Sequence, residues 1–338
     1  MKIGITLQPD DAVLDGQHLV QLTDIWLAAL EAEGCTPYTV AGYRNKLAHF
    51  STWWAATGPG QDWELRRRDL QAFGRWLETV QTPMGTPLAY NTRRDVLRRL
   101  QQMLRWAFAT DRLSMDLSKW VTKATGGPPK RRAMTLDELE RLLDAGATGD
   151  QPVRDRAIIA LFIGSGLRRA ELSGLNTDDV TFNAATNTGL AVVKGKRTTA
   201  NATGERTVVL DAATVGILRP YLRLFNPRPG EPLFFWTHGA ERRRIGMNGV
   251  YRIVRRAARR AGLADRMKGA HDLRRAFATL MVRYIAEHDT DLAADMVRRQ
   301  LGHASYSMTA YYNKMEPEDM AGVMKSPMSL IAQRGVTQ

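Results

Sequence analysis

A histidine and a tyrosine, His303 and Tyr312, stand nine residues apart near the end of the chain, in Leu301-Gly-His-Ala-Ser-Tyr-Ser-Met-Thr-Ala-Tyr-Tyr-Asn313. Histidine can transfer protons near neutral pH, and tyrosine can act as a nucleophile. A phenol has a pKa near ~10, so only about one molecule in a thousand is ionised at neutral pH. A reactive Tyr312 therefore needs positive charge and proton transfer from other parts of the chain.

Three upstream segments carry side chains that can meet this need. They are Gly166-Leu-Arg-Arg-Ala-Glu-Leu172, Val193-Lys-Gly-Lys196 and His271-Asp-Leu-Arg274. Arg168 and Glu171 share one helical face, where the carboxylate can orient the guanidinium, although the same spacing also suits a weak surface ion pair. His271 and Arg274 are expected to begin a helix and to point away from its apolar stripe. Because guanidinium groups and helix N-termini bind phosphate, the segments predict a phosphate site.

In order and spacing, these elements resemble the signature of the tyrosine recombinases, the phage-integrase family, over roughly residues 134 to 320. The layout is similar to that of the two-domain, Xer-like members. The resemblance implies that Tyr312 attacks a DNA phosphodiester and displaces a 5′-hydroxyl, which leaves a 3′-phosphotyrosyl link. It also implies four protomers on two DNA sites, passage through a Holliday junction, and no metal or other cofactor.

The resemblance distributes the catalytic roles among the other residues. Arg168 and Arg274 would neutralise the phosphate oxygens in the transition state, and Glu171 would support them. His271 would accept the phenolic proton or hydrogen-bond the phenol and phosphate, and His303 would hydrogen-bond the phosphate.

The lysine and the tyrosine each have neighbours of the same type. The family has a lysine on a β-hairpin, in a G-K-G-x-K pattern, which makes Lys194 the expected acid for the departing 5′-oxygen. A valine before it and a long turn after it depart from the pattern, so Lys196 remains an alternative. Tyr306 comes too early for the nine-residue step. Tyr311 is one residue off, which turns a helical side chain by about 100° away from Tyr312.

The elements that must position these residues predict a mainly α fold with a small β-sheet. We expect a helical core DNA-binding domain followed by a mixed α/β catalytic domain. The catalytic domain should contain a two-stranded hairpin, 189–196 and 205–210, and a helix over 250–261. The predicted divisions are an N-terminal arm (1–15), the helical domain (16–120), a linker (121–133), the catalytic domain (134–316) and a tail (317–338). The apolar tail would dock on a neighbouring protomer or close its own domain.

Four helices are expected in the helical domain, at His18–Ala32, from Pro37 to Trp54, at Arg68–Val80 and at Ala89–Ala109. Glycine and proline between them end or begin each helix. Seven of the eight tryptophans fall in the first 120 residues. At helical spacing among leucines they are expected to form the core, since large aromatic side chains dominate the cores of small domains.

The net charge of +13 and the pI of about 10.1 predict a polyanionic partner, most often nucleic acid. On the fourth helix, Val96, Leu100, Met103, Leu104, Ala107 and Phe108 form an apolar stripe. The opposite face carries Gln101 and three arginines, and the helix at 250–261 carries five more arginines. We expect DNA contacts from Arg94, Arg98, Arg105, Arg252, Arg255, Arg256 and Arg259.

Several classes of protein are excluded or ranked lower. A single cysteine, Cys35, allows neither an intrachain disulfide nor a multi-cysteine zinc site, and we expect neither a signal peptide nor a membrane-spanning run. We therefore expect a cytoplasmic, nucleoid-associated protein. The alternatives to a recombinase are a type IB topoisomerase-like enzyme and a non-catalytic DNA-binding protein of the same fold. Accessory DNA-bending or directionality proteins are further partners that the resemblance allows.

Overall fold

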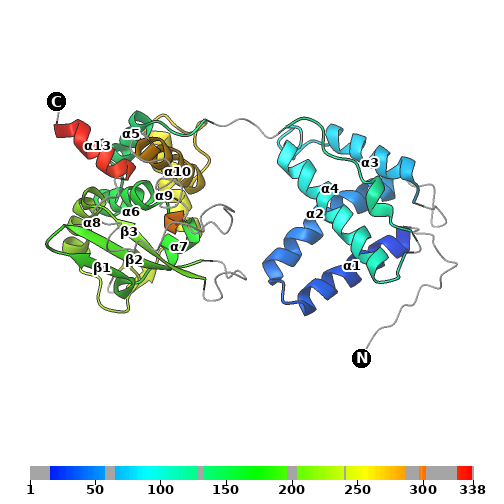
Figure 1. Ribbon diagram of the computed structural model, residues 1–338, viewed down its shortest axis with the longest axis horizontal. Coiled ribbons are helices and arrows are strands. Elements are labelled where there is room, and N and C mark those ends of the chain that lie inside the picture. Colours follow the sequence, from blue (N-terminus) through cyan, green and yellow to red (C-terminus); the bar gives the residue numbers. More distant parts are fainter. Residues whose placement is uncertain are drawn as a thin grey trace. The chain divides into compact units, whose positions relative to one another are not determined.

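The computed structural model describes residues 16–57, 65–113, 115–127, 132–195, 204–239, 241–286, 297, 299–301 and 326–336. The chain divides into two compact units, Met1–Arg131 and Arg132–Gln338, which Figure 1 draws in one view. The division falls inside the segment 121–133 predicted as a linker. The predicted arm, 1–15, lies outside the described residues. None of the described helices is both long and apolar enough to cross a membrane.

The described residues of the N-terminal unit form four α-helices and a short 3-10 helix. The helices are α1 (Gly16–Ala32), α2 (Pro37–Thr57), α3 (Arg67–Thr79), α4 (Tyr90–Ala109) and η1 (Leu117–Trp120). Gly34 follows α1 with a φ of +86°, a conformation that glycine adopts without strain. Pro37 opens α2 because the first helical position needs no backbone N–H. The four predicted helices are confirmed, with ends within three residues of those expected.

Aromatic side chains fill the core of this unit. Phe50 of α2 meets Phe73 of α3 edge to face, with ring centroids 4.7 Å apart. Trp26, Trp53 and Trp54 are all buried, as their spacing predicts. The apolar stripe of α4 is buried against α1 and α2 except for Phe108, which is 41% exposed. The inclusion of Phe108 in that stripe was therefore wrong: its neighbour Ala107 is buried in the same last turn of α4, whereas Phe108 faces away from the core.

The C-terminal unit surrounds a central helix, α6, with helices and two small sheets. In chain order the elements are α5 (Leu136–Gly146), α6 (Pro152–Ser165), α7 (Arg169–Gly174), η2 (Thr177–Asp179), β1 (Val180–Asn183), β2 (Thr188–Lys194), β3 (Glu205–Leu210), α8 (Ala212–Phe225), β4 (Phe235–His238), β5 (Glu241–Arg244), α9 (Met247–Arg260), α10 (Ala270–Ala286) and α13 (Pro327–Val336). Strands β1, β2 and β3 form one antiparallel sheet in that order, and β4 pairs with β5. The small sheets and predominant helices confirm the predicted fold class.

Helix α6 is buried almost all round, because α5, α8, α9, α10 and α13 pack against it. Its sequence matches this position, since apolar residues occupy every side rather than one stripe. Proline at its first turn and Gly166 in the left-handed conformation, φ +64°, fix its two ends. A Cβ at Gly166 would lie 2.7 Å from Leu301 and 2.8 Å from Phe277, so close packing also requires glycine there.

The described part of the predicted tail packs within its own unit. Met328 and Ile331 of α13 are buried in the core of the C-terminal unit. The carboxylate of Asp211, the N-cap of α8, accepts hydrogen bonds from the backbone N–H of Ser326 and the hydroxyl of Ser329. Residues 326–336 therefore pack within their own unit, one of the two possibilities expected for the tail, while docking on a neighbouring protomer stays a prediction.

Candidate phosphate-binding site

Arg168 and Glu171 are brought together by a tight helix start. Gly166 ends α6, Leu167 is buried, and Arg168 is the N-cap of α7. Glu171 accepts the backbone N–H of Arg168 at 2.7 Å, and the other carboxylate oxygen accepts Arg168 Nη1 at 2.7 Å. The Glu171 side chain is 1% exposed while that of Arg168 is 42% exposed. The pair is therefore not a surface ion pair: the Glu171 carboxylate is buried, and it holds an Arg168 guanidinium that remains accessible.

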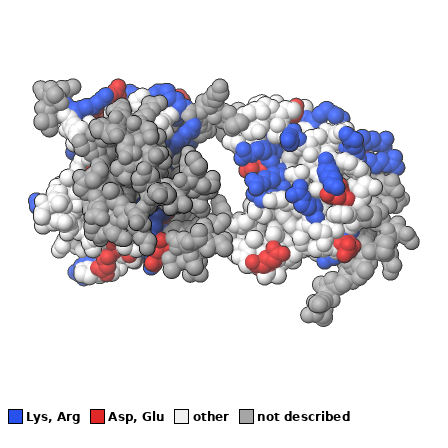
Figure 2. All heavy atoms as spheres, in the orientation of Figure 1, with Lys and Arg blue, Asp and Glu red and all other residues white. Residues whose placement is uncertain are grey.

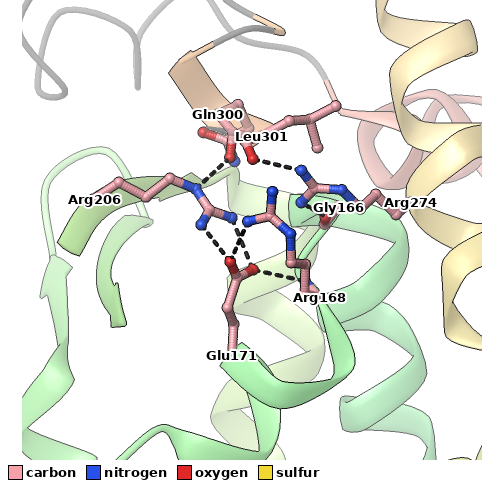
Figure 3. Close-up of polar contacts among 7 residues, drawn as sticks. All are labelled: Gly166, Arg168, Glu171, Arg206, Arg274, Gln300 and Leu301. Carbon is pink, nitrogen blue, oxygen red and sulfur yellow. Dashed lines mark hydrogen bonds and ion pairs between the residues drawn. The ribbon is translucent and has the colours of Figure 1, made fainter. Parts of the chain in front are cut away.

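Arg206 of β3 joins this pair and was not among the predicted site residues. Its Nη1 and Nη2 bind the two oxygens of Glu171 at 2.5 and 2.8 Å, and its Nε donates to the carbonyl of Gln300 at 3.1 Å (Figure 3). A usable signal is present in the sequence. Arg206 alternates with Val208 and Leu210, so it falls on a core-facing side of its strand, where an arginine needs a partner.

Arg274 lies on the far side of Arg168 from Arg206 (Figure 3). It is 4% exposed, donates to the carbonyl of Gly166 at 2.8 Å, and donates to the carbonyl of Leu301 at 2.5 Å. The expectation that Arg274 points away from the apolar side of its helix was therefore wrong. The carbonyls at the end of α6 and at Leu301 provide the polar partners that allow a buried guanidinium.

The charges of these residues influence one another. Burial would raise the pKa of Glu171, but hydrogen bonds from Arg206 and Arg168 and the positive charge of Arg206 lower it to about 2. Burial, together with the positive charge of Arg168, lowers the pKa of Arg274 to about 10. At neutral pH one carboxylate therefore faces three arginine cations. The cluster keeps an excess of positive charge, which favours the binding of an anion.

The last described residues before His303 are fixed to the same cluster. The side-chain amide of Gln300 exchanges two hydrogen bonds with the backbone of Val209, at 3.0 and 2.8 Å. The carbonyls of Gln300 and Leu301 accept Arg206 and Arg274 respectively. The chain therefore enters the segment that carries His303 from a point held against the arginines.

Lys194 is not among the residues that contact the cluster. It ends β2, its side chain is 74% exposed, and its ammonium lies 3.7 Å from Glu205. Lys194 pairs with Glu205 across the hairpin, while the preceding residue of β2 pairs with Arg206. Since directly paired residues share a face and successive residues alternate, Lys194 and Arg206 point to opposite faces.

The next residue, Gly195, does approach the cluster. A Cβ on Gly195 would lie 3.2 Å from Glu171 Oε1 and 3.7 Å from Arg168 Nη1. Its backbone N–H donates to the carbonyl of Gly204 at 2.7 Å, which closes the hairpin. The hairpin end therefore lies beside the arginines, one residue from Lys194.

The remaining predicted site residues are only partly covered. His271 lies in the first turn of α10 and is exposed. The next residue, Asp272, accepts the backbone N–H groups of Lys268 and Gly269, which stabilises the start of that helix. Outside the described residues lie Lys196, His303, Tyr306, Tyr311 and Tyr312. No cluster of metal-ligating side chains occurs among the residues that the structure describes.

The arginines predicted to contact DNA fall into two groups. Arg94, Arg98 and Arg105 of α4 are exposed, and Figure 2 shows basic side chains gathered on the visible face of the N-terminal unit, with a few acidic ones among them. Gln101, in contrast, donates to the carbonyl of Ser118 at 3.3 Å and so helps to pack η1. The exposed arginines of α4 therefore remain available to a polyanion.

Helix α9 mixes accessible and structural arginines. Arg252 and Arg259 are exposed and have no polar partner among the described residues, whereas Arg256 faces Asp150 at 3.4 Å. Arg255 donates to the backbone carbonyls of Ala264 and Met267. Its guanidinium therefore fixes the turn after α9, and its contact with DNA stays a prediction. A cavity of about 740 Å³ lies along the exposed side of α9.

Comparisons with known proteins agree with this geometry. The model described as "Phage integrase family" matches residues 132–319. Tyrosine recombinase XerD of Bifidobacterium longum (strain NCC 2705) is 27% identical over 318 residues, 89% of this chain and 94% of the relative. Tyrosine recombinase XerC of Neisseria gonorrhoeae (strain ATCC 700825 / FA 1090) is 29% identical over 323 residues, 91% of this chain and 95% of the relative.

Two solved structures have the same fold. A lambda integrase tetramer bound to a Holliday junction matches with a TM-score of 0.63 at 17% identity, over 91% of this chain and 82% of the other. The XerH site-specific recombinase in a post-cleavage complex with palindromic difH matches with a TM-score of 0.60 at 20% identity, over 86% of this chain and 78% of the other.

Proposed function

Because the chain belongs to the phage integrase family of tyrosine recombinases, we propose that it cuts and rejoins DNA at specific sites, with Tyr312 as the nucleophile. The phenolic oxygen of Tyr312 attacks the phosphorus of a phosphodiester and forms a new O–P bond. The bond to the 5′-oxygen breaks, so the DNA keeps a 3′-phosphotyrosyl link and a free 5′-hydroxyl. In the second half of the reaction a 5′-hydroxyl attacks that link and releases the tyrosine. The phosphate bond energy is retained throughout.

The observation that carries this proposal is the cluster of Arg168, Glu171, Arg206 and Arg274. Three positive charges gather around one buried carboxylate, which leaves an excess of positive charge. Arg168 donates only to Glu171 among the described residues, so its other N–H groups are free for phosphate oxygens. Preorganised charges of this kind stabilise the additional negative charge of a five-coordinate phosphate. We assign Arg168 and Arg274 to the non-bridging oxygens.

Two proton transfers complete the reaction. The phenolic proton of Tyr312 passes to His271, which is exposed one helical turn before Arg274. The departing 5′-oxygen takes its proton from Lys194, whose ammonium is exposed at the end of β2 beside Gly195. For this step the lysine side chain must leave Glu205 and turn toward the bound phosphate. His303 donates a hydrogen bond to the phosphate.

Recombination requires more than one protomer. A single active site cuts one strand, whereas exchange between two DNA sites needs four cuts, so we propose four protomers on two sites with a Holliday junction between the two rounds of cutting. The exposed arginines of α4 and α9 bind the duplex backbone. The protein then acts on nucleoid DNA in the cytoplasm as an integrase or another mobile-element recombinase, with or without accessory DNA-bending or directionality proteins.

A nicked suicide duplex tests the proposal. When the strand breaks beside the nick, a short fragment diffuses away and the protein stays covalently attached to the DNA. Candidate duplexes come from both ends of the DNA element that carries the gene. We expect a covalent band with the wild type and with Tyr311→Phe, and none with Tyr312→Phe. Loss of the band with Tyr311→Phe but not with Tyr312→Phe would reassign the nucleophile. Tight DNA binding with no band from any variant would favour the non-catalytic alternative.

A further inference from the structure

We propose that Arg206 is a positioning residue for the cleavage step: it sets Arg168 and the segment that leads to His303 in one geometry. This inference rests on the proposed function. The inference assigns Arg206 no contact with DNA, because each of its three guanidinium nitrogens already donates to a protein oxygen. Its effect on the phosphate therefore passes through the groups that it holds.

The first of these groups is Glu171. Arg206 binds both carboxylate oxygens side by side, at 2.5 and 2.8 Å, and this bidentate contact fixes the plane of the carboxylate. The same two oxygens receive the backbone and the side chain of Arg168. The direction of the Arg168 guanidinium is therefore determined by a carboxylate that Arg206 orients.

The second group is the backbone at residues 300 and 301. Arg206 Nε donates to the carbonyl of Gln300, and three residues along β3 the backbone of Val209 pairs with the Gln300 amide. The next carbonyl, that of Leu301, accepts Arg274. Strand β3 thus fixes the stretch that holds Arg274 and that leads, two residues later, to His303. Figure 3 shows Arg206 between Glu171 and Gln300, linking the two.

Replacing Arg206 by lysine would keep the positive charge and remove the planar two-nitrogen contact, so the two effects can be told apart. The lysine ammonium keeps the positive charge beside Glu171, but a single nitrogen on a flexible stem cannot bind two carboxylate oxygens in a plane and the Gln300 carbonyl together. The Arg206→Lys variant should therefore fold and bind DNA, but its Arg168 guanidinium should no longer be held in one orientation. Arg206→Gln removes the charge as well. Arg243→Gln is the matched control, because Arg243 pairs with Glu241 at 2.9 Å on the surface.

The experiment compares two linkages in the suicide duplex, with the full-length protein. One carries the natural phosphodiester and the other a methylphosphonate, in which a methyl group replaces one non-bridging oxygen and removes its charge. A variant that has lost directed positive charge should be slow on the natural linkage and much less impaired on the neutral one. A variant that is merely unstable should lose the same factor on both. Arg168→Ala provides the benchmark for lost charge stabilisation.

We expect Arg206→Lys to slow single-turnover cleavage of the phosphodiester on the order of 100-fold, the size of effect that a small displacement of a catalytic group produces. On the methylphosphonate the same variant should be within about threefold of the wild type, given that the remaining geometry is unchanged. DNA affinity and melting temperature should match those of Arg243→Gln. Equal losses on both linkages, or no loss on either, would overturn the positioning role. Failure of the wild type to form any covalent product would instead refute the proposed function.

Discussion

Replacing Glu171 by glutamine should destabilise the C-terminal unit by an amount that depends on pH. The substitution keeps the size of the side chain but removes the carboxylate that Arg168 and Arg206 share. Because the pKa of Glu171 falls from 4.5 to about 2 on folding, ionised Glu171 stabilises the fold by about 3 kcal/mol at neutral pH, at about 1.4 kcal/mol per pKa unit. Glu171→Gln should lose at least this amount, since it leaves the largely buried guanidinium of Arg206 without its carboxylate partner.

The direction of the pH dependence follows from the lowered pKa. Protons bind Glu171 more tightly in the unfolded chain, so its contribution is complete above about pH 4.5 and disappears as the pH falls toward 2. At pH 3 roughly 1.4 kcal/mol should remain. The difference in the free energy of unfolding between wild type and Glu171→Gln should therefore shrink by about half between pH 7 and pH 3.

Urea titrations at the two pH values can measure this difference. At each urea concentration, hydrogen-exchange mass spectrometry of peptides from β2 and β3 reports how much of the protein is unfolded. These peptides report on the C-terminal unit alone. The control is Glu241→Gln, whose exposed ion pair with Arg243 should contribute less than about 1 kcal/mol. Equal unfolding midpoints for wild type and Glu171→Gln at pH 7, or a difference that does not shrink at pH 3, would refute the electrostatic account of the cluster.

Three further substitutions test other parts of the structure. Gly195→Ala would place a Cβ 3.2 Å from the Glu171 carboxylate, so cleavage of the suicide duplex should slow about tenfold or more while DNA affinity is kept; an unchanged rate would contradict this. Arg252→Ala should lower the slope of log affinity against log salt by about 1, whereas Arg255→Ala should leave that slope unchanged and lower the melting temperature. Asp211→Asn should speed hydrogen exchange in α13, since its carboxylate holds that helix; unaltered exchange would count against the anchor.

Helix positions were accessible from the sequence because they depend on local patterns. Leucine and tryptophan at helical spacing, with glycine and proline between segments, place the four helices of the N-terminal unit. The hairpin of β2 and β3 follows from two runs rich in valine on either side of a polar turn. The joint presence of Arg168, Glu171 and Arg274 in one cluster agrees with the motif spacing.

The direction of individual side chains was less accessible, because it depends on contacts between distant segments. A helical wheel placed Arg274 away from the apolar stripe, yet the carbonyls of Gly166 and Leu301, from two other segments, allow it to be buried. Arg206 was missed because no short motif contains both Arg206 and Glu171, which are 35 residues apart. In the sequence Arg255 looks like the other arginines of α9. It differs from them only because its guanidinium donates to backbone carbonyls in the turn at 264–267.

The burial of α13 makes the core of the C-terminal unit depend on two helices that lie far apart in the sequence. Met328 and Ile331 fill a core whose other walls include α5, the first helix of the unit, and Arg334 of α13 pairs with Asp137 of α5. A chain cut before α13 would therefore leave an apolar surface exposed on α6 and α8. The N-terminal unit contains its own core and does not depend on α13. Loss of α13 should thus destabilise the C-terminal unit, which contains the arginine cluster, and leave the N-terminal unit folded.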